Sequence, residues 1–357
     1  MNHRKRNKVS IISRESNTKT LDIRLLEEEL LRRGVRVETL TRLLTKERSV
    51  KSLGYLGHLA KQIVSIAGSG VVVLDTYCIP ISMLPHHKGL KTIQMWHALS
   101  AVKKFGWQTV GKEDGSSLKT ARLMKMHEGY DYVACASDIT ARHFCEAFKV
   151  PKDKIVKLGL PRIDYIRSVT SGEGKERTAA AVYAEYPQLR DSGRKVVLYA
   201  PTFHKGKPAD VRGLVDALDP QRYTVIVKLH PIDKAAGETV EAENVIYDQK
   251  FMSYDLLSVA DAVVSDYSSL VVESTLSEVP LYLYVYDIDS YSRTTGLNVD
   301  FDEEPISSYV FRKAEPLAAA LEQPYDFDAL HAFRDRYIDI DTADCTAALA
   351  DFIESLL

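Results

Sequence analysis

The chain has 357 residues, of which 45% are hydrophobic and 27% are charged, and its formal net charge is −2. These values are typical of a soluble globular protein of about two domains, without the excess positive charge that favours nucleic-acid binding. No run of about 18 apolar residues predicts a transmembrane helix. The basic N-terminus, residues 1–8, lacks the apolar segment of a signal peptide.

The four cysteines form no recognisable motif. Cys78, Cys135, Cys145 and Cys345 are spaced neither like metal ligands nor like a disulfide framework. We therefore expect small buried thiols in a reducing cytoplasm.

The chain opens with a strand, a helix and a second strand. We expect the strand at 9–12, a polar loop at 13–20, the helix at 21–33 and the second strand at 34–40. Such an opening favours a parallel sheet. The first turn contains no glycine, so the dinucleotide-binding fingerprint is absent and an NAD-dependent enzyme is disfavoured.

The segment 49–66 has two interpretations. Its apolar residues recur at helical spacing, with the basic residues elsewhere: Leu53, Leu56, Leu59, Ile63 and Ile66 against Lys51, His58 and Lys61. One interpretation is a basic amphipathic helix that lies on an anionic membrane surface. The other is a helix packed on the sheet, before the strand at 71–74.

The strand predicted at 92–95 delivers Trp96 and His97 at its carboxyl end, where open α/β sheets bind ligands. The following loop contains Lys103, Lys104 and several glycines without periodicity. This composition suits contact with an anionic or lipid-linked ligand, although a solvated surface loop has a similar composition.

A domain boundary is expected near residue 168. After a strand at 131–136, a helix ending near residue 148 and an extended stretch at 154–158, a turn at 159–164 contains Arg162. Arg162 is either a bidentate phosphate donor or part of a salt-bridged hinge. Residues 168–177 have the composition of a linker, so we expect domains at 1–167 and 168–357, with the last helix able to pack back on the first domain.

The second half repeats the α/β alternation. Strands are expected at 196–199, 223–229, 245–246, 262–265 and 281–284, with later helices from about residues 314, 327 and 342. Polar motifs follow three of these strands, around Thr202, His230 and Asp266. They therefore lie at one edge of the predicted sheet.

The turn after the strand at 262–265 is rich in hydroxyl groups. Ser268 and Ser269 stand at the start of a predicted helix, whose free N–H groups and dipole favour phosphate. Glu273 lies one turn further on, where a carboxylate can accept hydrogen bonds from a ribose. The alternative is that the serines only cap the helix and that Glu273 faces water.

Five motifs in order carry a resemblance to a known family. They are Gln94-Met-Trp96-His97-Ala98 with Lys103-Lys104-Phe105-Gly106, Gly159-Leu-Pro161-Arg162-Ile-Asp164, Leu198-Tyr-Ala-Pro201-Thr202-Phe203, Lys228-Leu-His230-Pro231 and Ser265-Asp266-Tyr267-Ser268-Ser269. Over about residues 90–290 the chain resembles the CDP-glycerol glycerophosphotransferases of teichoic acid synthesis. The resemblance implies a GT-B fold, in which two doubly wound Rossmann-like α/β domains face each other across a cleft.

The resemblance also implies an activity and a location. The enzyme would transfer glycerol phosphate from CDP-glycerol to a hydroxyl of a polyprenyl-diphosphate-linked saccharide or polymer and release CMP. It would act as a peripheral protein at the cytoplasmic face of the cell membrane, on an anionic surface, without nucleic acid.

The resemblance assigns His97 as the base and His230 to the diphosphate or the leaving phosphate. The other implied site residues bind the phosphates and nucleotide of the donor or lie on the acceptor side: Thr202, Asp266, Ser268, Ser269, Glu273, Arg162 and Lys234 for the donor, and Trp96, Lys103 and Lys104 for the acceptor. Glu273 is placed on the ribose by analogy with other GT-B enzymes, and Lys234 stands where some relatives have an arginine. The sequence contains no metal-binding motif. Asp266 lies in the predicted diphosphate region, so a weak dependence on Mg²⁺ is compatible with the sequence.

Several alternatives keep the fold or the motifs. The alternatives are CDP-ribitol as donor, a GT-B glycosyltransferase that uses a UDP-sugar, and a non-catalytic module that binds nucleotide or lipid. The motifs are compatible with a primase or a polymerase, and with a wall teichoic acid or a capsule as product.

Overall fold

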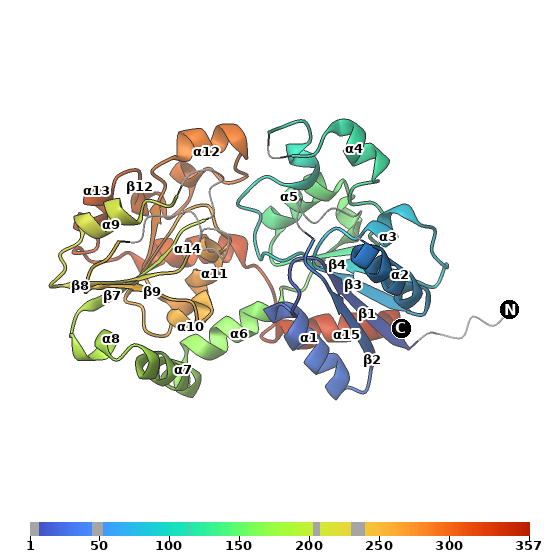
Figure 1. The fold of residues 1–357 in the computed structure, drawn as a ribbon, viewed down its shortest axis with the longest axis horizontal. Helices are drawn as coiled ribbons and strands as arrows, with labels where there is room; N and C mark the ends of the chain where they lie inside the picture. Colours follow the sequence, from blue (N-terminus) through green and yellow to red (C-terminus); the bar gives the residue numbers. More distant parts are fainter. Residues whose placement is uncertain (1–6, 45–52, 114, 203–207, 230–239) are drawn as a thin grey trace. The chain divides into compact units, whose positions relative to one another are not determined.

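The computed structural model describes residues 7–44, 53–113, 115–202, 208–229 and 240–357, which form two α/β units (Figure 1). Unit 1 comprises Met1–Asp164 and Tyr337–Leu357, and unit 2 comprises Tyr165–Arg336. The chain leaves unit 1 within α6 (Pro161–Thr170) and returns at the end of α14 (Phe327–Tyr337). The boundary therefore falls inside helices, a few residues before the predicted position, and the last helix belongs to unit 1.

Unit 1 contains a six-stranded parallel sheet in the order β2-β1-β3-β4-β5-β6. Its strands are β1 (Lys8–Ser13), β2 (Arg36–Thr41), β3 (Val71–Leu74), β4 (Lys91–Gln94), β5 (Tyr132–Cys135) and β6 (Ile155–Lys157). The strand order reverses beside β1, because β2 lies on one side of it and β3 on the other. Ligands of doubly wound sheets bind at the carboxyl ends of the strands at such a reversal.

The helices of unit 1 cover this sheet. They are α1 (Leu21–Arg32), α2 (Leu53–Ala67), α3 (Ile79–Met83), η1 (Gly106–Thr109), α4 (Leu118–Leu123), α5 (Asp138–Phe148), η2 (Lys152–Lys154) and α15 (Cys345–Leu356). α15 packs against α1, and Arg33 next to α1 pairs with Asp351 and Glu354 of α15. The final helix is thereby attached to the first one.

α2 buries a face of mixed polarity, in which Tyr55 and Ile66 lie beside three polar side chains. Its polar side chains His58, Gln62 and Ser65 are buried, and the Ser65 hydroxyl lies 2.5 Å from that of Ser10 in β1. Val64 is 74% exposed, and other apolar residues of the helix are also on the surface. Residues 49–52, with Lys51, lie outside the described residues. Among the helices that the structure describes, none is long and apolar enough to span a bilayer.

Residues 159–177 were predicted wrongly as a turn followed by a linker. α6 begins at Pro161 and α7 spans Gly172–Glu185, so nearly all of this stretch is helical. Proline is well accepted at the first position of a helix, where its missing N–H is not needed. The glycines and serines near residue 171 mark the junction of the two helices, which explains the linker-like composition.

Unit 2 contains a second six-stranded parallel sheet, in the order β12-β11-β10-β7-β8-β9. Its strands are β7 (Lys195–Ala200), β8 (Tyr223–Val227), β9 (Val245–Tyr247), β10 (Ala262–Ser265), β11 (Leu281–Tyr284) and β12 (Val310–Phe311). The order reverses between β7 and β10. The two doubly wound α/β domains of the predicted fold class are thus confirmed, and only β12 was not predicted.

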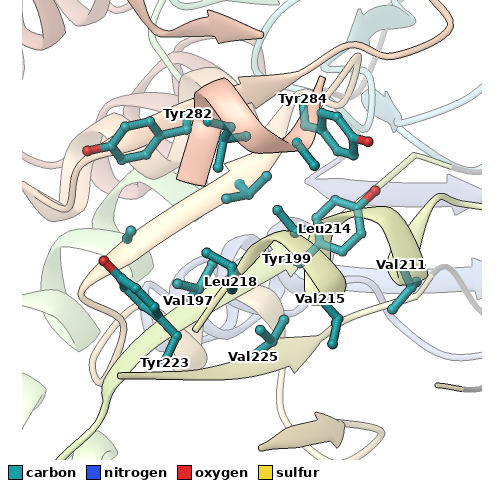
Figure 2. Packing of buried hydrophobic residues seen from close by; sticks show 14 of the residues in the cluster. Val197, Tyr199, Val211, Leu214, Val215, Leu218, Tyr223, Val225, Tyr282 and Tyr284 are labelled. Carbon is teal, nitrogen blue, oxygen red and sulfur yellow. The ribbon is translucent and has the colours of Figure 1, made fainter. Parts of the chain in front are cut away.

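Helices also cover the sheet of unit 2. They are α8 (Gln188–Asp191), α9 (Val211–Ala217), α10 (Ser253–Leu256), α11 (Leu270–Glu273), η4 (Ser274–Ser277), α12 (Ile288–Thr294), η5 (Phe301–Glu303), η6 (Ser307–Tyr309) and α13 (Ala314–Ala320), together with α7 and α14. Figure 2 shows Leu214 and Val215 of α9 packed near Val197 and Tyr199 of β7. Burial of this apolar surface holds the polar loops at the strand ends in place.

Asp164 generates the first prediction. Its carboxylate accepts hydrogen bonds from the backbone N–H groups of Cys345 (3.0 Å) and Thr346 (2.7 Å) at the start of α15. Asp164→Ala should leave these groups unpaired and destabilise the docked helix by about 1–2 kcal/mol. Amide hydrogen exchange in α15 measures this loss.

Asp344→Ala is the matched control, because Asp344 caps the same helix from an exposed position through Ala347 N–H. We expect a smaller loss of amide protection in α15 for Asp344→Ala than for Asp164→Ala. Equal protection of α15 in the Asp164 variant and the unmodified protein would contradict the prediction.

Candidate active-site residues at the strand ends

The carboxyl end of β4 has an unusual backbone. Trp96 has φ = 59°, a conformation that is uncommon for a bulky residue and is often found at functional sites. The buried Gln94 supports it: its Oε1 accepts the Trp96 N–H at 2.9 Å, and its Nε2 donates to the Thr76 carbonyl at 3.1 Å. One amide side chain thus joins the residues that follow β3 to those that follow β4.

His97 has a defined orientation. Its Nδ1 lies 3.0 Å from the backbone carbonyl oxygen of Asp75. Since a carbonyl oxygen can only accept, Nδ1 carries a proton, and the neutral form of the ring has its lone pair on Nε2. The half-buried imidazole is therefore in the tautomer in which Nε2 can remove a proton, as the predicted base requires.

Arg162 supports the same loop. Its guanidinium Nε donates to the Asp22 carboxylate at 2.8 Å, and its Nη2 donates to the His97 carbonyl oxygen at 2.9 Å. Arg162 and Asp22 are both buried. Of the two predicted roles of Arg162, phosphate donor and salt-bridged residue, this ion pair supports the second and gives Arg162 a structural role beside His97. A phosphate would have to displace Asp22.

Asp75 was missed by the sequence interpretation. It directly follows β3 and is only 1% exposed, and neither of its carboxylate oxygens has a hydrogen-bond partner among the described residues. Burial raises the pKa of Asp75 to about 6, against the opposing effects of Ser13, His97 and Thr76. An aspartate directly after a fully apolar strand was the available sequence signal.

Trp96, one of the residues predicted to lie on the acceptor side, belongs to an aromatic cluster. The Trp96 ring stacks on Phe105, with centroids 4.6 Å apart, and meets the edge of Phe148. The loop can approach α5 only because residue 106 is glycine, with φ = 57°; a Cβ there would lie 2.3 Å from the Ala147 carbonyl oxygen.

Two further features complete the surroundings of this cluster. Lys103 and Lys104 precede Phe105 and are half-buried. Trp107 lies under the Lys149 ammonium, 3.4 Å from the ring centroid. The structure therefore brings the two halves of the first motif together around Trp96.

The strand ends of unit 2 are joined by Asp266. Its carboxylate accepts the N–H groups of Thr202 (2.9 Å) and Tyr267 (2.6 Å), which follow β7 and β10. Asp266 is buried and holds these loops together. The Thr202 hydroxyl is buried next to this connection, and within the described residues it has no hydrogen-bond partner.

The predicted phosphate-binding helix is shorter than expected. α11 spans only four residues, Leu270–Glu273, before a 3₁₀ turn, so its dipole is small. The Ser268 hydroxyl accepts the Leu270 N–H at 3.2 Å, whereas Ser269 makes no capping bond with its side chain. Both serines are half-buried. Any phosphate binding here depends on these hydroxyls and local N–H groups.

Glu273 is buried rather than facing water, and it accepts the Tyr254 hydroxyl at 2.7 Å. A ribose would have to share or replace this bond. His230 and Lys234 lie outside the described residues, so their roles stay predictions from the resemblance. Within the parts of the chain that are described, no group of three or more His, Cys, Asp or Glu side chains is arranged to hold a metal ion.

Comparisons with known proteins agree over most of the chain. The family described as CDP-Glycerol:Poly(glycerophosphate) glycerophosphotransferase matches residues 1–355. The chain is 31% identical to the teichoic acid ribitol-phosphate primase of Bacillus spizizenii over 317 residues, which cover 85% of this chain and 79% of the primase. It is 28% identical to the teichoic acid glycerol-phosphate primase of Bacillus subtilis over 308 residues, covering 84% and 77% of the two chains.

A solved structure shows the same architecture. The wall teichoic acid polymerase TagF superposes with a TM-score of 0.71 at 18% identity, covering 98% of this chain and 89% of that chain. At this identity the similarity is evidence for the fold.

The support of His97 by Gln94 generates the second prediction. Gln94→Leu removes the link between the Thr76 carbonyl and the Trp96 N–H, so the Asp75 carbonyl should no longer hold Nδ1–H of His97. We expect ¹⁵N NMR of the imidazole to change from one tautomer to a mixture. Leaving the two buried backbone groups unpaired should also cost about 1–3 kcal/mol of stability.

His86 and His87 are internal controls in the same spectra. Their Nε2 atoms lie 2.9 Å and 3.0 Å from backbone carbonyl oxygens, which selects the opposite tautomer. Their signals should not change in the variant. A His97 signal that is also unchanged would show that Gln94 does not position the ring.

Proposed function

Because the chain belongs to the CDP-glycerol:poly(glycerophosphate) glycerophosphotransferase family, we propose that it transfers glycerol phosphate from CDP-glycerol to a hydroxyl of a polyprenyl-diphosphate-linked saccharide or polymer, with release of CMP. The observation that carries the proposal is the orientation of His97 within the matched region. Its Nε2 lone pair is available at the carboxyl end of a central strand, as deprotonation of a hydroxyl requires.

In this proposal His97 moves one proton. As the acceptor hydroxyl oxygen bonds to the phosphorus of glycerol phosphate, its proton passes to Nε2 of His97. The bond between that phosphorus and the CMP oxygen breaks, and CMP leaves with the bonding electron pair. Hydrogen bonds from Ser268, Ser269 and Thr202 would stabilise the charge on the phosphate oxygens. Asp266, as an acceptor of N–H groups, would position this segment instead of contacting phosphate.

CDP-ribitol is a second candidate donor. The ribitol-phosphate primase of Bacillus spizizenii is 31% identical to the chain and aligns with 85% of it, slightly above the values for the glycerol-phosphate primase of Bacillus subtilis. The two donors share the cytidine diphosphate and differ only in the polyol. Competition between them in one assay therefore identifies the preferred donor.

We further propose that unit 1 contacts the anionic surface of the membrane that carries the acceptor. Leu56 and Ile63 of α2 are 50% and 43% exposed, and Val64 points outward beside them. α3 packs against α2 and adds the exposed Met83 and Leu84. Exposed apolar side chains gathered on neighbouring helices favour insertion into the interfacial layer of a bilayer.

Basic groups border this apolar surface. A hollow of about 240 Å³ between α2 and α3 is lined by residues including Ile63, Leu84, His86 and His87. Lys61 and Lys88 are exposed in the same two segments. Lysines next to an apolar surface favour anionic lipid head groups, which supports a peripheral location at the cytoplasmic face.

The proposed reaction is tested by CMP release. Purified protein should release CMP from CDP-glycerol or CDP-ribitol only when a lipid-linked disaccharide acceptor is present. His97→Ala should lower kcat by about 10²–10⁴-fold because the base is lost, while the Kd of the donor changes less than about twofold. His331→Ala, which changes an exposed histidine paired with Glu278 outside both the site and the proposed membrane surface, is the control and should keep kcat.

Three outcomes would contradict the proposal. Release of UDP from a UDP-sugar would indicate a glycosyltransferase, and absence of CMP release with either donor and membranes would favour a non-catalytic module. Full turnover in the His97 variant would remove this residue as the base.

Membrane contact is tested by vesicle binding. Ile63→Glu with Val64→Glu should weaken binding to phosphatidylglycerol-containing vesicles by tenfold or more, because each burial of such a side chain contributes about 1.5–3 kcal/mol. Leu31→Glu is the control, since Leu31 is equally exposed on α1 but lies outside the proposed surface. Equal losses in both variants, or none, would contradict the proposal.

A further inference from the structure

Asp75 differs from several other aspartates that the structure describes. Asp22, Asp164 and Asp266 each accept at least two hydrogen bonds from named N–H or hydroxyl groups. Asp131, at the opposite edge of the unit 1 sheet, accepts from the N–H and the hydroxyl of Thr92. Asp75 is as buried as Asp22, yet both of its oxygens lack a hydrogen-bond partner in the described parts of the chain.

The position of Asp75 is that of a ligand-binding residue. It follows β3, whose neighbour β1 marks the reversal of strand order in unit 1. Its own backbone carbonyl receives Nδ1–H of His97, so the carboxylate and the imidazole belong to the same strand ends. The carboxyl ends of strands at a reversal are where doubly wound sheets bind ligands.

The charged groups around Asp75 do not neutralise it. The Ser13 and Thr76 hydroxyls lie close enough to lower the pKa of Asp75, although neither makes a hydrogen bond of normal geometry with its carboxylate. His97, from the segment after β4, also lowers this pKa, and Glu15, from the segment after β1, raises it. Burial without a compensating partner is unfavourable for an ionised carboxylate, and the raised pKa of about 6 reflects this cost.

We propose that Asp75 is a binding residue for the acceptor: its carboxylate accepts a hydrogen bond from a polyol or sugar hydroxyl placed next to His97. This inference rests on the proposed phosphotransfer. A hydroxyl of the acceptor supplies the hydrogen-bond donor that both carboxylate oxygens lack. It is either the hydroxyl that His97 deprotonates or one next to it on the same acceptor.

Other ligand classes fit this position less well. A phosphate would be repelled by the buried carboxylate, so Asp75 selects the uncharged part of the acceptor. A metal ion normally requires several ligands, and Asp75 belongs to no group of three or more His, Cys, Asp or Glu side chains suited to a metal within the described residues.

A stability measurement separates a binding role from a structural one. Asp75→Asn keeps the shape and removes the charge, so it should stabilise the free protein. Burial raises the pKa of Asp75 from the ordinary 3.8 to about 6, and Asp75→Asn removes this cost. The folding equilibrium constant of the variant should therefore be about a hundredfold larger than that of the unmodified protein at pH 8. The gain should fall to about tenfold at pH 5, because the ionised carboxylate is disfavoured only above its unfolded-state pKa. Asp131→Asn, which removes a carboxylate with two partners, should instead destabilise the protein.

Kinetics with a defined acceptor complete the test. The probe is a short-chain prenyl-diphosphate-linked disaccharide, with and without a terminal glycerol phosphate. We expect kcat/KM for this acceptor to fall about tenfold in Asp75→Asn, whose amide oxygen can still accept weakly, and about a hundredfold in Asp75→Ala. The Kd of the CDP-linked donor should stay within about twofold, and Asp131→Asn should keep the acceptor kinetics.

The outcomes distinguish this inference from the proposed function. If the unmodified protein releases no CMP with any acceptor, the function fails. If it is active but Asp75→Asn and Asp75→Ala keep its acceptor kinetics, or if Asp75→Asn is less stable at pH 8, the inference fails and the function stands. A stabilised variant with weakened acceptor kinetics supports the inference.

Discussion

The buried pair of Asp22 and Arg162 is the interaction on which the arrangement of unit 1 depends. It joins α1 to α6, segments 140 residues apart in the sequence, and the same guanidinium holds the His97 carbonyl oxygen. Removing one partner of a buried ion pair leaves the other charge without compensation, at a cost of about 3–5 kcal/mol. The position of His97, the proposed base, therefore depends on the packing of α1 against α6. Neither helix contacts the substrate in the proposed reaction.

The two sheets differ in strand order and in the chemistry of their strand ends, but they share one feature. Each reverses its strand order once, and a buried aspartate follows a strand beside each reversal. In unit 2, Asp266 uses its charge to join two loops through their N–H groups. In unit 1, Gln94 makes the corresponding connection, and Asp75 keeps its oxygens unpaired. This difference fits a rigid support for the donor in one unit and a hydroxyl-binding position in the other.

The fold and part of the site were predictable from the sequence, for physical reasons. Strands such as β10 are short apolar runs, so their carboxyl ends, with Asp266 after β10, could be located from pattern alone. The same pattern located β3, but the aspartate that follows it was missed. A salt-bridged role of Arg162 was one of the predicted alternatives, but its partner Asp22 was not predictable because it is distant in sequence. The helices α6 and α7 were missed because the glycines and serines at their junction resemble a linker. The outward apolar face of α2 depends on polar partners such as Ser10, which periodicity does not reveal.

The aromatic cluster beside His97 has an optical consequence. The chain contains two tryptophans, Trp96 and Trp107, and both belong to unit 1. Trp96 stacks against Phe105 and touches the His97 ring, whereas Trp107 lies under the Lys149 ammonium. The tryptophan fluorescence of the protein therefore originates entirely in the unit that holds the proposed base. A protonated imidazole quenches a neighbouring indole, so the emission of Trp96 is a label-free signal for the charge state of His97.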